Sequence, residues 1–161
     1  MTDRDIAQDK AVEALIENDY NGSIIAGTGF GKTRVMVSAI LSKLDGDKSS
    51  KALVLVPFDH LKDRFRDEFD KLIGKKKSAI VCEEMVQFEC YASIGKLKAS
   101  DYKIIVCDEV HLGLTDKCII LYDILDWLYI IITCIVYYVN MQSQPPQSNI
   151  WQQYFYIYKS G

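Results

Sequence analysis

Residues 26–33 read Ala26-Gly27-Thr28-Gly29-Phe30-Gly31-Lys32-Thr33, between an apolar run at 23–25 and a segment with helical periodicity. The three glycines allow backbone conformations that side chains would forbid, so successive N–H groups can face phosphate oxygens. The lysine suits the β- and γ-phosphates, the threonine hydroxyl suits Mg²⁺, and the start of a helix attracts an anion. The octet therefore predicts a nucleotide-binding P-loop, although the strict pattern has glycine at position 26. A plain strand-to-helix turn is the alternative.

A second motif follows the apolar run 104–107, where the sequence continues as Asp108-Glu109-Val110-His111. A strand that ends in two carboxylates suits magnesium-assisted phosphoryl transfer. We expect Asp108, together with Thr33, to hold Mg²⁺, and Glu109 to orient or deprotonate the attacking water. Asp108, Glu109 and Lys32 are thus the predicted catalytic residues. A buried strand followed by a solvated acidic loop is the alternative.

These two motifs, in this order, resemble motifs I and II of the DExH-type helicases and translocases of superfamily 2. Alanine commonly opens motif I in that superfamily, which accounts for position 26. The segment 53–57, followed by Leu61 and Phe65, is similar to motif Ia. The resemblance covers residues 4 to 128. It implies an α/β, RecA-like P-loop domain that uses ATP and Mg²⁺ and, in the intact protein, couples ATP hydrolysis to movement along DNA or RNA.

The resemblance also implies roles for residues outside the two main motifs. Pro57, Phe58 and Arg64 correspond to the motif Ia region that lies on the nucleic-acid backbone, with Phe58 where the family often has threonine. His111 corresponds to the residue that links the ATP site to nucleic-acid motion. Gln8 is similar to the adenine-reading glutamine of many members, and a solvent-facing glutamine on a helix is the alternative.

Helical and extended patterns alternate along the chain, which favours a mainly parallel sheet with helices on both faces. The predicted helices are 3–18, a helix from the P-loop to residue 44, and 59–73. The predicted strands are 23–26, 52–56, 78–82 and 103–107, with irregular or helical pieces between the last two. The uncharged run 127–139 is too short for a membrane span and suits a buried strand.

The domain is predicted to cover residues 1–139, with a non-domain tail at 140–161 that begins with a Gln- and Pro-rich stretch. That tail is either a disordered linker or a product of translation in the wrong frame. Neither motif III nor a second RecA-like domain is found in the 161 residues. We therefore expect this chain alone to bind nucleotide weakly and turn it over poorly, to bind DNA or RNA weakly, to lack its partner domain, and to self-associate through exposed apolar faces.

Composition agrees with an intracellular globular domain, because five cysteines form no Cys-x-x-Cys pair and the N-terminus has no apolar secretion signal. The formal net charge of -3 provides no electrostatic case for nucleic acid. Two other classes of function stay open: a truncated, non-catalytic nucleotide-binding module and another small P-loop NTPase, such as a kinase. A kinase would need an arginine-rich lid. No arginine occurs between residues 112 and 161, which disfavours this alternative.

Overall fold

The computed structural model describes residues 1–27, 29–45, 47, 49–75, 83–109, 129–133 and 156–157. Its helices are α1 (Asp3–Glu17), α2 (Lys32–Leu44), α3 (His60–Lys75) and the short 3-10 helices η1 (Glu83–Met85), η2 (Tyr91–Lys96) and η3 (Ala99–Asp101). Its strands are β1 (Gly22–Ile25), β2 (Ala52–Val56), β3 (Val86–Cys90), β4 (Ile104–Asp108), β5 (Tyr129–Thr133) and β6 (Tyr156–Ile157).

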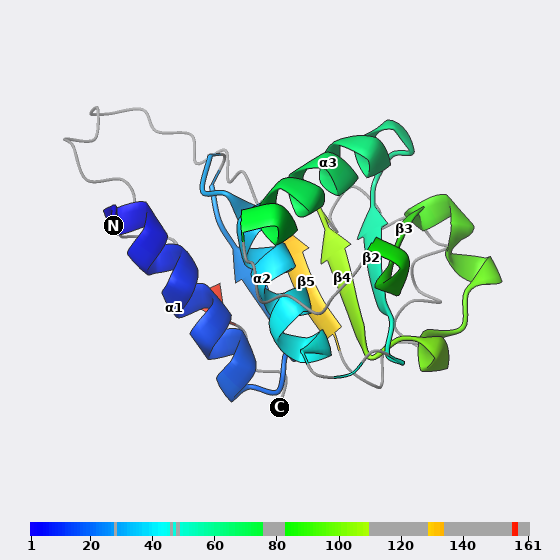
Figure 1. The fold of residues 1–161 in the computed structure, drawn as a ribbon, viewed down its shortest axis with the longest axis horizontal. Coiled ribbons are helices and arrows are strands. Elements are labelled where there is room, and N and C mark those ends of the chain that lie inside the picture. The colour runs from blue at the N-terminus through cyan, green and yellow to red at the C-terminus, as the bar shows by residue number, and fades with distance from the viewer. Residues whose placement is uncertain are drawn as a thin grey trace, which may run out of the picture.

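The strands form one sheet in the order β3-β2-β4-β5-β1-β6 (Figure 1). All neighbouring strands are parallel except β6, which runs antiparallel to β1. Strand β5 lies between β1 and β4, pairing with both. Because parallel strands point the same way, the segments that follow β1, β2 and β4 emerge at one rim of the sheet, where ligands bind in such folds.

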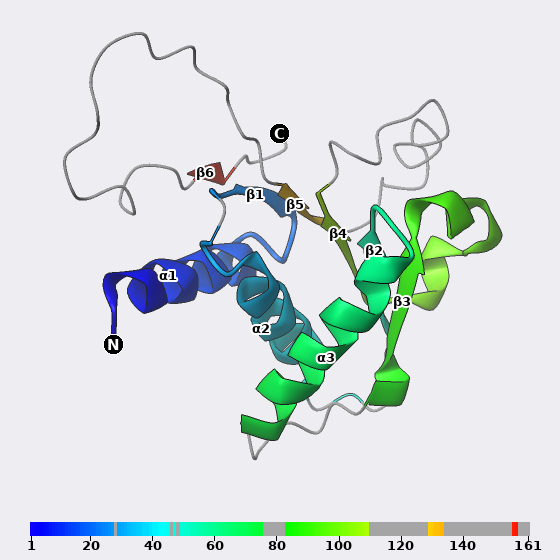
Figure 2. The ribbon, with the colours of Figure 1, turned by 90° about the horizontal axis from the view of Figure 1, so that it is seen from above.

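The three α-helices cover one face of the sheet, as the view from above shows (Figure 2). Strand β2 is buried along its whole length. Ala52, Val54 and Val56 belong to the core beneath the α-helices, whereas Leu53 and Leu55 pack with η2 on the opposite face. Burial on both faces explains why this strand is an unbroken apolar run.

Helix α3 is amphipathic and turns its aromatic side towards the edge of the sheet. Phe65 and Phe69 contact the Phe88 ring of β3, with ring centroids 5.8 and 6.0 Å apart. Phe69 is fully buried and Phe65 nearly so. Such tilted and edge-on aromatic pairs add to the stabilisation from apolar burial. This packing fixes the first turns of α3 beside the ligand-binding rim.

Most predicted elements agree with these bounds within one or two residues, including the helix that starts at the P-loop. Strand β3 corrects the prediction, because residues 86–90 were expected to be irregular or helical. The strand predicted at 78–82 lies outside the described residues. Strand β5 falls inside the predicted run 127–139, and β6 falls inside the predicted tail. The other residues of both segments lie outside the described part.

Among the described residues, no helix is both long and apolar enough to cross a bilayer.

Candidate functional site

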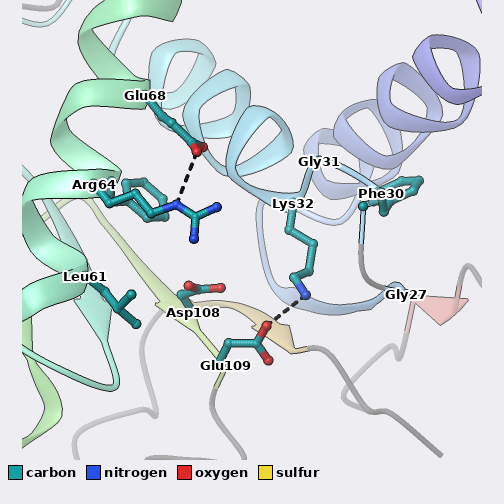
Figure 3. A pocket seen from close by; sticks show the side chains of 11 residues that line it. Gly27, Phe30, Gly31, Lys32, Leu61, Arg64, Glu68, Asp108 and Glu109 are labelled. Atoms are coloured by element: carbon teal, nitrogen blue, oxygen red, sulfur yellow. Dashed lines mark ion pairs between the residues drawn. The ribbon is translucent and has the colours of Figure 1, made fainter.

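A pocket of about 310 Å³ opens at the ligand-binding rim, between the start of α2, the first turns of α3 and the end of β4 (Figure 3). The loop and α2 contribute Gly27, Gly29, Phe30, Gly31 and Lys32; α3 contributes Leu61, Arg64, Phe65 and Glu68; β4 and the following loop contribute Asp108 and Glu109. The two motifs that the sequence singles out thus form opposite sides of one cavity.

The P-loop turns tightly through two glycines in the left-handed region. Gly29 has φ +82° and Gly31, the N-cap of α2, has φ +84°. A Cβ atom on Gly31 would also press against Nε2 of Gln8, so a side chain at this position would require Gln8 to move. Since the first N–H groups of a helix have no partner inside it, this turn presents the positive end of α2 to the pocket.

Gln8 supports this loop from behind. Its side chain is 3% exposed, and Nε2 donates a hydrogen bond to the carbonyl oxygen of Phe30. Its Oε1 is buried without a hydrogen-bond partner among the described residues. The solvent-facing alternative for Gln8 is therefore wrong. Its amide contacts the loop and does not line the pocket, and the adenine contact stays a prediction.

Lys32 and Glu109 meet at the floor of the pocket (Figure 3). The Lys32 Nζ atom lies 2.8 Å from Glu109 Oε1, and the two side chains are 14% and 21% exposed. Glu109 has φ +48°, a left-handed conformation that is uncommon for a residue with a side chain. The turn after β4 thus directs the second carboxylate towards the P-loop lysine, and a phosphate oxygen entering here would compete with Glu109 for that lysine.

Asp108 is the last residue of β4 and is partly buried beside this ion pair. Burial raises the pKa of its carboxyl group from 3.8 to about 6, the Glu109 carboxylate adds to the rise, and Lys32 and Arg64 oppose it. Burial and the neighbouring carboxylate therefore disfavour the charged form of Asp108. A buried carboxylate of this kind in a cleft is typical of a functional site.

Tyr91, the first residue of η2, is hydrogen-bonded to the backbone of Asp108. Its buried side chain donates a hydrogen bond of 2.8 Å from Oη to the backbone carbonyl oxygen of Asp108. That carbonyl belongs to the peptide that connects Asp108 to Glu109. The contact therefore restrains the turn that aims Glu109 at Lys32.

The three residues predicted for nucleic acid separate in the structure. Pro57 and Phe58 follow β2 outside the pocket, where Phe58 is 51% exposed and stacks on the His60 ring at a centroid distance of 5.7 Å. Arg64 instead lines the pocket. The sequence places all three on one motif Ia segment. Arg64 lies about one helical turn into α3, and at that position it faces the pocket that the P-loop also lines.

The remaining predicted residues occupy several positions. Ala26 directly follows β1 and is buried, and Thr33 lies in the first turn of α2. Thr28 and His111 lie outside the described residues. Across the described ranges, no group of three or more His, Cys, Asp or Glu side chains could enclose a metal ion.

Four residues that contribute to the site were not predicted to do so, although the motif Ia resemblance includes Leu61 and Phe65. Leu61, Phe65 and Glu68 line the pocket from α3, and Tyr91 contacts Asp108. The available signal for the first three was positional, because α3 follows a parallel strand and so begins at the ligand-binding rim. No local pattern around Tyr91 indicated its contact.

Comparison with solved structures shows the same fold in helicases. The chain is similar to the UvsW helicase of bacteriophage T4, with a TM-score of 0.61, 16% identity, and coverage of 79% of this chain and 51% of that chain. It is also similar to a hypothetical ATP-dependent RNA helicase of Sulfolobus tokodaii, with a TM-score of 0.54, 18% identity, and coverage of 80% and 45%. The chain therefore spans about half the length of these two structures. The predicted RecA-like α/β fold is confirmed.

Comparison of the sequence with protein families gives a match over residues 4–131 to the family described as "Type III restriction enzyme, res subunit". No curated protein matches the chain. Because the family match covers most of the sequence, this chain belongs to the family of the type III restriction enzyme res subunit.

Proposed function

We propose that this domain binds ATP with Mg²⁺ and that the intact protein, a DExH-type member of superfamily 2, couples ATP hydrolysis to movement along DNA or RNA. The observation that carries this proposal is the meeting of Lys32 and Glu109 in one pocket, 2.8 Å apart. They come from the P-loop and from the acidic motif, which are far apart in the sequence. ATP hydrolysis requires a phosphate-binding cation and a water-positioning carboxylate in the same site.

The loop backbone, Lys32 and Glu109 have distinct roles in this proposal. The loop glycines and the start of α2 hold phosphate oxygens through backbone N–H groups. Lys32 exchanges its Glu109 partner for the β- and γ-phosphates. Glu109, once released, orients a water molecule towards the terminal phosphorus and accepts its proton. The ion pair therefore occupies the place where Lys32 would contact the phosphates and Glu109 would contact the attacking water.

The donor set also fits Mg²⁺. Bound Mg²⁺ would neutralise charge on the β- and γ-phosphate oxygens. Asp108 and Thr33 would hold the ion, which usually takes only one or two protein ligands and completes its shell with phosphates and water. This suits a site where the described residues form no larger acidic cluster. The raised pKa of Asp108 fits as well, because a cation beside the carboxylate would stabilise its charged form.

A second RecA-like domain is the partner that this proposal requires. Motors of this kind close two domains on ATP, and the chain spans about half the length of the helicases it matches. We infer that this chain alone binds nucleotide weakly, hydrolyses it poorly and does not separate strands. We also propose that the faces prepared for the partner domain favour self-association, and that the protein works inside the cell.

Nucleic acid is proposed to lie across the end of β2, beside Pro57 and Phe58. The exposed Phe58 ring offers an aromatic surface where the family often has threonine. Bases of either DNA or RNA can stack on such a ring without sequence preference. His111 is proposed to link this surface to the ATP site.

Equilibrium binding of a fluorescent ATP analogue, with and without Mg²⁺, tests the proposal. Lys32→Ala should weaken binding by about 10- to 100-fold, because a charge-assisted contact contributes about 1.5–3 kcal/mol. Its thermal unfolding should stay close to wild type, since Lys32 lies at a pocket and not in the core. Lys43→Ala is a matched control, because this lysine lies at the other end of α2 and pairs with Asp19. Equal affinity of the Lys32→Ala variant and the wild type would overturn the proposal.

A further inference from the structure

We propose that Arg64 binds the terminal phosphate of ATP, so that this domain itself supplies an arginine which distinguishes ATP from ADP. The inference rests on the proposed function and deepens it. It also changes the role of Arg64, which the sequence resemblance assigns to nucleic acid.

The position of Arg64 carries the inference. Its guanidinium group extends from α3 over Asp108, on the side of the pocket away from Gly27 (Figure 3). The P-loop occupies the other side and encloses the inner phosphates. The terminal phosphate must lie beside Glu109, because that carboxylate orients the attacking water. Arg64 is therefore at the end of the cavity where the terminal phosphate lies.

Arg64 also has the hydrogen-bonding capacity for this role. Within the described residues its ion-pair partner is Glu68, with Nε and Oε1 3.6 Å apart, which is too long for a hydrogen bond. The side chain is 77% exposed. A guanidinium group carries five N–H donors in a planar fork that matches phosphate oxygens. Arg64 can thus turn towards a phosphate without breaking a strong contact.

The electrostatics of the pocket agree with this placement. The positive charge of Arg64 lowers the pKa of Asp108 against the larger effect of burial, so its field reaches that carboxyl group. Lys32 acts on the same carboxyl group from the other side. Two cations thus face one space above two carboxylates, as a triphosphate with Mg²⁺ would require.

Arg66 provides a matched control on the same helix. It lies 3.4 Å from Asp63 and stacks over the Phe88 ring of β3, with its Cζ atom 5.4 Å from the ring centroid. It does not line the pocket. A general effect of removing one positive charge from α3 would appear in both arginine variants, whereas a phosphate contact would appear only at Arg64.

The test compares the affinities of Mg²⁺–AMP-PNP and Mg²⁺–ADP by calorimetric titration. Arg64→Ala should weaken AMP-PNP binding about tenfold and leave ADP binding within about twofold of wild type. Arg64→Lys should recover part of the loss, and Arg66→Ala should leave both affinities unchanged. Glu68→Gln, which removes the competing carboxylate, should raise AMP-PNP affinity about twofold.

Three outcomes would overturn the inference, and they are distinguishable from failure of the proposed function. Equal loss of both nucleotides, or loss of neither, would show that Arg64 does not contact the terminal phosphate. Loss of polynucleotide affinity alone would return Arg64 to the nucleic-acid surface. In each of these cases Lys32→Ala would still weaken both nucleotides, so the proposed ATP site would stand. If the wild-type chain bound neither nucleotide, the proposed function would fail, and this inference with it.

Discussion

Replacing Asp108 with asparagine should stabilise the folded domain while impairing its magnesium dependence. The substitution keeps the shape of the side chain and removes a negative charge that burial and Glu109 make unfavourable. The rise of the Asp108 pKa from 3.8 to about 6 corresponds to about 3 kcal/mol. Part of the carboxylate is exposed, and water screens that part. We therefore expect the free energy of unfolding to increase by about 1–3 kcal/mol at pH 7.5.

The gain should depend on pH in a defined direction. Because the pKa is higher in the folded state, the unfolded chain ionises first as pH rises, and wild-type stability falls between about pH 4 and pH 6. The difference between Asp108→Asn and wild type should therefore vanish below pH 4 and be complete above pH 6. Urea unfolding followed by circular dichroism, at pH 4 and pH 7.5 without Mg²⁺, measures it.

Asp101→Asn serves as the control, because Asp101 is exposed on η3 and its substitution should change stability by less than about 0.5 kcal/mol. Destabilisation of Asp108→Asn at pH 7.5 would refute the reasoning. It would mean that the Asp108 carboxylate supports the fold and is not a charge held at the expense of stability.

Three further substitutions test other parts of the site. Gly31→Ala should destabilise the fold by about 1–3 kcal/mol in urea unfolding, because of its positive φ and the contact behind it, whereas Gly27→Ala, with open space at its Cβ position, should not; equal effects would contradict this. Tyr91→Phe should lower stability by about 1 kcal/mol and reduce AMP-PNP affinity, since the restraint on Asp108 is lost; a variant with unchanged affinity would assign Tyr91 a purely structural role. Phe58→Ala should weaken single-stranded polynucleotide binding about fivefold or more in fluorescence anisotropy and spare nucleotide affinity; unchanged polynucleotide binding would remove Phe58 from that surface.

The sequence predicted best those parts of the molecule that depend on neighbouring residues. The glycine pattern at 27–31 indicated a tight turn before a helix, and Gly29 and Gly31 have the positive φ angles that such a turn needs. The continuous apolar runs at 52–56 and 104–107 indicated strands, and the structure has β2 and β4 there. In each case the signal lies within a few residues of the feature.

The features that were missed depend on tertiary contacts. Strand β3 is half-buried at the edge of the sheet and alternates over only five residues, so its pattern is weak. The hydrogen bond from Gln8 to the P-loop was not predicted, because it depends on how α1 packs against that loop. The direction of Arg64 depends on the phase of α3 relative to the pocket, which a motif match does not specify. The contact between Lys32 and Glu109 likewise required the order of strands in the sheet.

The most direct test of the ATP site is a titration of the ¹⁵N-labelled chain with Mg²⁺–AMP-PNP, followed by amide chemical shifts. The account predicts saturable shifts at the amides of Gly29, Gly31 and Lys32, which line the pocket beside the start of α2, and at that of Glu109 across it. The amides of η3, none of whose residues lines the pocket, should not move. Saturable binding that shifts other residues and leaves the P-loop unchanged would contradict the account, as would the absence of any shift at millimolar nucleotide.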